Sequence, residues 1–136
     1  MDPEALIRSF IEEAFNKGNL SILDDIIHPG YQFSSPDSRM EGISQLKAFI
    51  ESFRNAFPDL KICIDDIFAT EDRTCTLFTL TGTHEENFMG IPPTNKAVEV
   101  RGVVVSKIQD NKIREEWEIL DNLSFFQQLG VIPSLS

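Results

Sequence analysis

The segment 97–121, AVEVRGVVVSKIQDNKIREEWEILD, decides the fold of this chain. Apolar and polar residues alternate on both sides of Asp110-Asn111, a dipeptide typical of a tight hairpin turn. We therefore expect two antiparallel strands, Ala97–Gln109 and Lys112–Leu120, joined directly by this turn.

The turn also predicts a register for the two strands, with Gln109 opposite Lys112. In that register Trp117, Ile119 and Asp121 share one face with Val98, Val100, Gly102 and Val104. Because this face is apolar, we expect helices to cover it. An acid at the end of an apolar stripe is the strongest chemical anomaly in the sequence.

The opposite face of the hairpin is mostly charged, but Val103 and Val105 also lie on it. An apolar patch there would suit contact with a second subunit, so we expect a homodimer. The alternative is that long neighbouring side chains cover the two valines.

Helices precede strands in the rest of the chain. Apolar residues spaced three and four apart predict helices over 2–17, 21–27, 42–57 and 123–129, the third beginning at Gly42 or Ser44. Alternating residues predict strands over 31–34, 60–70 and 74–84. This order predicts a single α+β domain, 1–136, with helices packed on one face of a curved sheet.

Composition narrows the classes of partner. The chain has 136 residues and a formal net charge of −10, which argues against nucleic acid and anionic membranes as partners. It contains no apolar run long enough to span a membrane and no signal-peptide pattern at the N-terminus. Cys63 and Cys75 lie too far apart on the predicted hairpin for a disulfide, and no zinc-binding spacing occurs. We therefore expect a cytoplasmic protein with reduced cysteines and no metal.

Asp121 has two interpretations. Beside Trp117 in an apolar pocket it would be a general base, because burial raises a carboxyl pKa toward neutral pH. Such a base suits removal of a proton next to a carbonyl group. The alternative is that Asp121 caps the terminal helix, a common position for aspartate.

A histidine and a long loop are the next candidates. His84 ends a predicted strand and could bind a substrate carbonyl or orient the base; alternatively it is a half-exposed histidine at a loop edge. The connection 85–96 is long for a hairpin and holds apolar Phe88, Met89 and Ile91. We expect it to fold over the mouth of a pocket, or else to pack on the core or a partner subunit.

Eleven phenylalanines make any cavity between helices and sheet aromatic, although those on helix faces are also typical of a core. The predicted pocket residues are Trp117, Ile119, Phe15, Phe33, Phe53, Phe57, Phe88, Met89 and Val104.

Several motifs occur in one order along the chain: Phe57-Pro58-Asp59-Leu60, Gly82-Thr83-His84, the segment 88–96 (FMGIPPTNK), and Glu116-Trp117 leading to Asp121. This series resembles the SnoaL-like polyketide cyclase (ester cyclase) family, within the nuclear transport factor 2-like superfamily. The resemblance implies a cone-shaped α+β fold, with N-terminal helices in the concave face of a curved antiparallel sheet. It also implies a deep apolar pocket, frequent dimers and no cofactor.

The resemblance further implies a reaction. In such cyclases the aspartate after the tryptophan strand is the base of an intramolecular aldol closure, a role that would belong to Asp121. The ligand would be a small apolar carbonyl compound, with His84 as a further catalytic candidate. Two alternatives remain open, a binding module of the same fold without catalysis and a domain that serves only dimerisation.

Overall fold

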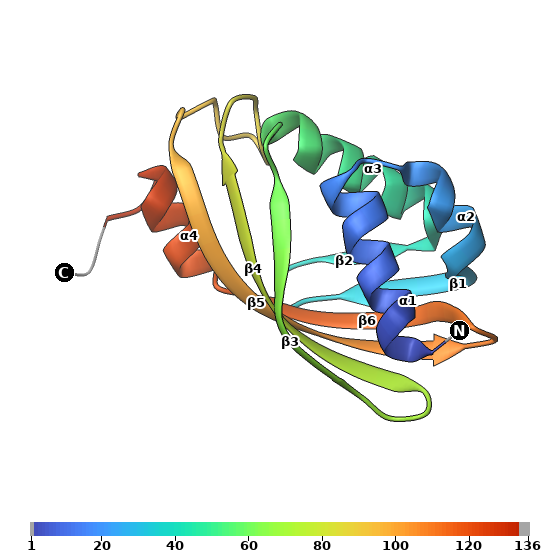
Figure 1. Cartoon of the computed structure of the whole chain (residues 1–136). Helices are drawn as coiled ribbons and strands as arrows, with labels where there is room; N and C mark the ends of the chain where they lie inside the picture. Colours follow the sequence, from blue (N-terminus) through green and yellow to red (C-terminus); the bar gives the residue numbers. More distant parts are fainter. Residues whose placement is uncertain (1, 134–136) are drawn as a thin grey trace.

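The computed structural model describes residues 2–133, and it confirms the α+β class (Figure 1). The helical elements are α1 (Pro3–Ser9), η1 (Phe10–Asn16), η2 (Leu20–Ile22), α2 (Leu23–Ile26), α3 (Gly42–Ala56) and α4 (Asn122–Leu129). The strands are β1 (Ile27–Ser34), β2 (Arg39–Glu41), β3 (Lys61–Ala69), β4 (Arg73–Thr83), β5 (Ala97–Gln109) and β6 (Lys112–Leu120).

The strands form one curved sheet in the order β2-β1-β6-β5-β4-β3. Its pairs are antiparallel, as expected, except that β1 runs parallel to β6. These two strands are far apart in the sequence, so no hairpin turn sets their relative direction. Helices α1, α2 and α3 lie on the concave side, whereas α4 lies beside β5 at the C-terminal end (Figure 1).

The first helix begins regularly and then widens. The Asp2 carboxylate accepts the N–H of Ala5 at 3.2 Å, which caps α1. The single helix predicted over 2–17 continues instead as the π-helix η1, in which the N–H of Lys17 donates to the carbonyl of Glu12. The π-helix directs Phe10 and other apolar side chains into the core.

The second predicted helix is shorter than expected. It ends at Ile26, and Ile27 already has the extended backbone of β1. Pro29 favours this early end, because proline disfavours helical backbone in the residue before it, His28. The short strand β2 is absent from the sequence-based prediction.

The β5–β6 hairpin has the predicted bounds but not the predicted register. Gln109 pairs with Lys112, as expected, and then a bulge leaves Arg114 without a partner in β5. Beyond the bulge, Lys107 faces Glu115 and the register is shifted by one residue. A shift of one residue exchanges the two faces of a strand.

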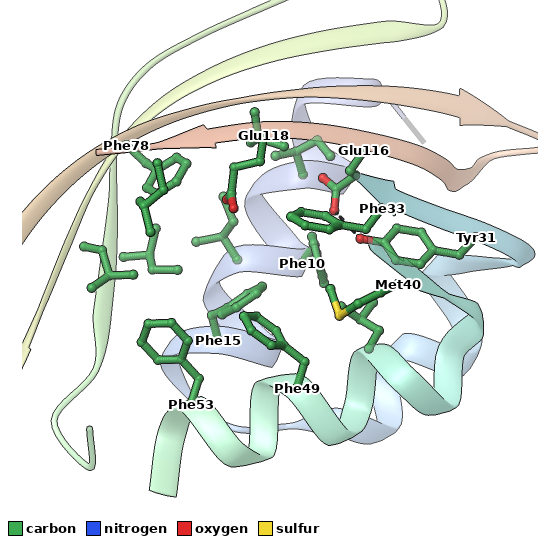
Figure 2. A pocket seen from close by; sticks show the side chains of 17 residues that line it. Phe10, Phe15, Tyr31, Phe33, Met40, Phe49, Phe53, Phe78, Glu116 and Glu118 are labelled. Atoms are coloured by element: carbon green, nitrogen blue, oxygen red, sulfur yellow. Dashed lines mark hydrogen bonds between the residues drawn. The ribbon is translucent and has the colours of Figure 1, made fainter. Parts of the chain in front are cut away.

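The predicted inward face of β6 is therefore wrong. Trp117 and Ile119 lie on the outer face and are 49% and 43% exposed. Glu116 and Glu118 instead point toward the helices (Figure 2). The prediction for β5 is correct, because Val98, Val100 and Val104 are buried.

Two sequence-based expectations concern cysteines and membranes. Cys63 pairs with Thr79 in the β3–β4 ladder, and both Cys63 and Cys75 are free thiols, as expected. None of the helices within 2–133 has the length and apolar character to cross a bilayer.

Gly102 leaves room for an aromatic ring on the concave face of β5. A Cβ atom at this position would lie 2.5 Å from Cζ of Phe78 and 3.0 Å from Cδ1 of Leu120. The contact with Phe78 is closer than packed carbon atoms allow and the contact with Leu120 is tight, so a side chain at this position would force the Phe78 ring to move.

We expect Gly102→Ala to lower the free energy of unfolding by about 1–3 kcal/mol, because the added methyl overpacks the core. Denaturant unfolding monitored by circular dichroism measures the change. Phe78→Leu, combined with Gly102→Ala, should recover part of the loss by removing the clashing ring. Equal stability of Gly102→Ala and wild type would refute the packing argument.

Candidate functional site

A cavity of about 90 Å³ lies between the helices and the concave face of the sheet. Figure 2 shows the side chains that line it. Most of them are apolar: Ile7, Phe10, Ile11, Phe15, Phe33, Met40, Leu46, Phe49, Phe53, Ile62, Phe78, Leu80, Val104 and Leu120. The polar members are Tyr31, Glu116 and Glu118, which cluster on the side formed by β1 and β6.

Glu116 is held by two hydroxyl groups. The Tyr31 hydroxyl donates to its Oε1 at 2.9 Å, and the Ser106 hydroxyl donates to its Oε2 at 2.6 Å. The residue is only 7% exposed. Burial raises the pKa of Glu116 despite these two hydrogen bonds, which favour the charged form. Burial and the neighbouring Glu116 carboxylate hold the pKa of Tyr31 well above its ordinary value.

Glu118 has a different environment. Within 2–133 no side chain or backbone group forms a hydrogen bond or ion pair with its carboxylate. Burial, and secondly the charge of Glu116, raise the pKa of Glu118 to about 7. Glu118 can therefore gain or lose a proton near neutral pH, as a general acid or base must.

A second cavity, of about 120 Å³, adjoins the first. The two share Phe33, Met40, Phe49, Phe53, Glu118 and Leu120, so Glu118 faces both. The outer cavity is also lined by residues of the 35–38 loop, the 85–96 connection and α4. At its rim, the Asn122 side-chain amide donates to the Asp37 carboxylate at 3.1 Å.

The 85–96 connection contributes two of the predicted pocket residues to this outer cavity. Phe88 and Ile91 exchange backbone hydrogen bonds around Met89-Gly90, both with positive φ. Phe88 is buried, and its ring packs against those of Phe53 and other phenylalanines. Met89 is 74% exposed and lines the outer cavity.

Asp121 lies outside both cavities. It is exposed and caps α4, accepting the backbone N–H of Ser124 at 3.1 Å. Asp121 therefore lies where the alternative interpretation, a cap of the terminal helix, places it. Its role as a general base stays a prediction.

His84 is completely buried rather than half-exposed at a loop edge. Its Nδ1 accepts the backbone N–H of Thr94 at 3.2 Å and lies 3.0 Å from the Thr94 hydroxyl oxygen. Its ring stacks on Phe57, with centroids 5.2 Å apart. His84 lines neither cavity, and its Nε2 has no hydrogen-bond partner within the described residues.

The other predicted pocket residues divide into three groups. Phe15, Phe33, Phe53 and Val104 line the inner cavity. Phe57 is buried behind it, against His84. Trp117 and Ile119 lie on the outer face of the sheet, as described above. Within 2–133 no group of three or more His, Cys, Asp or Glu side chains is placed to hold a metal ion.

Sequence reasoning missed Tyr31, Glu116 and Glu118. The two glutamates were visible on either side of Trp117, but the unbulged register assigned them to the outer face. The sequence pattern places Tyr31 in a short predicted strand and indicates no role for it. For the two glutamates, the available signal is their i, i+2 spacing, which places both acids on the same face of any strand.

Burial of Glu118 makes stability depend on pH. Its folded-state pKa lies above its ordinary value of 4.5, so its contribution is fully present below pH 4.5 and is lost as pH rises through about 7. We expect Glu118→Gln to match wild type near pH 4 and to be more stable by about 3 kcal/mol at pH 8. Urea unfolding at both pH values measures this difference.

Glu115→Gln is the matched control for this experiment, because Glu115 is an exposed glutamate on the same strand. It should change stability little at either pH. A stability difference between Glu118→Gln and wild type that is the same at pH 4 and pH 8 would contradict the assignment.

The sequence and the fold of this chain are similar to those of known proteins. Residues 5–129 match the SnoaL-like polyketide cyclase family. IdmH from Streptomyces antibioticus, a candidate polyketide cyclase, is 30% identical with a TM-score of 0.82, over 96% of this chain and 99% of its own. AclR from Streptomyces galilaeus, a candidate hydroxylase, is 29% identical with a TM-score of 0.84, over 96% of both chains. TsrD from Streptomyces laurentii is 26% identical with a TM-score of 0.87, over 97% of this chain and 99% of its own.

No match was found among curated proteins. Because the family match extends over nearly the whole chain and agrees with the fold, the chain belongs to the SnoaL-like polyketide cyclase family.

Proposed function

We propose that this protein catalyses cofactor-free enolate chemistry on a small apolar carbonyl compound, with Glu118 as the general base. The observation that carries the proposal is a carboxylate in an apolar cavity, without a partner among residues 2–133 and with a pKa of about 7. A base with a pKa near the working pH combines the correct protonation state with a strong driving force for proton transfer. Membership of a cyclase family supports the same class of reaction.

The proposed reaction is an intramolecular aldol closure. The Glu118 carboxylate removes a proton from the carbon next to a carbonyl group, and the C–H electron pair forms the enolate. The enolate carbon then attacks a second carbonyl of the same molecule, which forms the C–C bond. Glu118 returns its proton to the resulting alkoxide, so the residue ends the cycle as it began.

The surroundings of Glu118 suit this role. Apolar side chains from α3, η1 and the sheet surround the cavity, which keeps the carboxylate poorly solvated and basic. Glu116 cannot readily act as a second base, because the hydroxyls of Tyr31 and Ser106 occupy both of its oxygens. Its charge instead helps to raise the pKa of Glu118.

Asp121 remains the candidate that family resemblance implies, and His84 remains the candidate carbonyl partner. Reaction at Asp121 would require the substrate to reach the exposed end of β6, outside both cavities. His84 would require the 85–96 connection to open, because the ring is fully buried. Glu118 requires neither, and we therefore place it first.

A comparison of two variants separates the candidate bases. With a β-dicarbonyl ester that wild type converts, we expect Glu118→Gln to lower kcat by about 100-fold or more, since general-base catalysis contributes about that much. Asp121→Asn should retain kcat within a few-fold and change stability little, because asparagine caps a helix about as well as aspartate. Product formation followed by chromatography, with each variant checked by circular dichroism, measures both.

The opposite result, full activity of Glu118→Gln and loss in Asp121→Asn, would assign the base to Asp121.

For wild type, kcat should rise with pH through about 7, because the base acts in its deprotonated form.

A non-catalytic binding module of the same fold is the second candidate. The observation that favours it is that, of the residues the structure describes, only the two glutamates bring a charge to the inner cavity, so none of them offers a cationic side chain to a developing oxyanion. It predicts binding of carbonyl compounds without conversion. An unfilled cavity with two acids favours either of these functions over a domain that serves dimerisation alone.

We also propose a homodimer formed through the outer face of the sheet. The shifted register adds Trp117 and Ile119 to Val103 and Val105 on this face, and Leu77 on β4 is also exposed. The patch is therefore more apolar than the expected pair of valines, and apolar patches of this kind mark protein contacts.

Ile119→Glu tests this interface, because it places a charge in the centre of the patch. We expect sedimentation velocity to show wild type as a dimer and the variant as a monomer. Val131→Glu is the control, since Val131 is also exposed but follows α4, away from the sheet face. A wild type that sediments as a monomer would refute the interface.

A further inference from the structure

The inner cavity combines an aromatic lining with an excess of negative charge. Its aromatic side chains are those of Phe10, Phe15, Tyr31, Phe33, Phe49, Phe53 and Phe78. Its carboxylates are Glu116 and Glu118, and its lining residues in the described part of the chain include no Lys, Arg or His. A buried carboxylate is ordinarily paired with a cation, and here the described residues provide none.

Glu118 is the carboxylate whose charge is not balanced. Glu116 accepts two hydroxyl hydrogen bonds, whereas Glu118 accepts none within 2–133. The residue is half-buried overall and lines both the inner and the outer cavity. Figure 2 shows that group pointing into the cavity, where a bound molecule would meet it.

We propose that this cavity binds a small lipophilic ammonium ion, with the nitrogen at Glu118 and the apolar body among the phenylalanine rings. The carboxylate supplies a charge-assisted hydrogen bond, and ring faces attract cations through their quadrupole. Burial of the apolar body adds the hydrophobic contribution. The proposal uses the same cavity as the proposed reaction but does not depend on that reaction.

Other cations fit the cavity less well. Mg²⁺ and Ca²⁺ require six or more oxygen ligands, and no group of three or more acidic, histidine or cysteine side chains converges within 2–133. An organic ammonium needs only one or two carboxylate oxygens and gains from the apolar wall. The approach also favours a cation, because the outer cavity carries Asp37 and the chain has a net charge of −10.

Three ligands with the same phenyl group and different charges test the proposal: phenethylamine, 2-phenylethanol and phenylacetate. Isothermal titration calorimetry with the full chain at pH 8 gives their dissociation constants. We expect phenethylamine, which is a cation at this pH, to bind at least 10-fold more tightly than 2-phenylethanol. Phenylacetate should bind more weakly than either, because its carboxylate would face Glu116 and Glu118.

Glu118→Gln should remove most of the preference for the amine while leaving the affinity for 2-phenylethanol nearly unchanged. Glu115→Gln, on the exposed side of the same strand, should retain the wild-type order. Equal affinities of wild type for the amine and the alcohol would overturn the proposal. So would an amine preference that survives intact in Glu118→Gln, since the cation would then bind elsewhere.

The result of the amine-binding experiment does not depend on whether the proposed reaction occurs. Binding is measured without substrate, so the amine preference can hold in a protein that converts no carbonyl compound. Conversely, turnover that depends on Glu118 can occur in a protein that shows no preference for the amine. Where both hold, phenethylamine should inhibit turnover competitively and Glu115→Gln should not alter that inhibition.

Discussion

The unpaired residue in β6, Arg114, determines which side chains of this strand face the helices. Its presence shifts the pairing with β5 by one residue, so that the side chains beyond it change faces. The Arg114 guanidinium donates a hydrogen bond to the carbonyl of Gly30 in β1. The β1–β6 pairing is itself irregular at this point, between Ile27 and Gln32. Arg114 therefore connects the irregular parts of two neighbouring strands and stabilises the shifted register.

The consequence of this register is a cavity that the fold alone would not require. With the unbulged register, Trp117 and Ile119 would fill the space under the helices with apolar side chains. With the observed register, Glu116 and Glu118 occupy that side of the sheet, and their burial costs free energy. The hydroxyls of Tyr31 and Ser106 offset this cost for Glu116. No protein group within 2–133 does so for Glu118, which is typical of a residue retained for function rather than for stability.

Much of the fold could be predicted from the sequence, because its signals are local. The bounds of β5 and β6 follow from alternation and the Asp110-Asn111 turn, and the last helix ends at Leu129 as expected. The curved sheet and its family followed from the order of elements and motifs. The site was less predictable, because a single extra residue has no compositional signature. Whether the bulge falls before or after Trp117 depends on packing across three strands, which no local pattern reports.

Glu116 affects both the proposed proton transfer and the proposed binding of an ammonium ion at Glu118. Its charge, held in place by Tyr31 and Ser106, is one of the two causes that raise the pKa of Glu118. The proton that Glu118 binds near neutral pH therefore relieves repulsion within the pair. An ammonium ion would relieve the same repulsion without protonating either group. Transfer of a carbon-bound proton from the substrate to Glu118 also relieves this repulsion. The proton transfer therefore has a driving force that an isolated glutamate would lack.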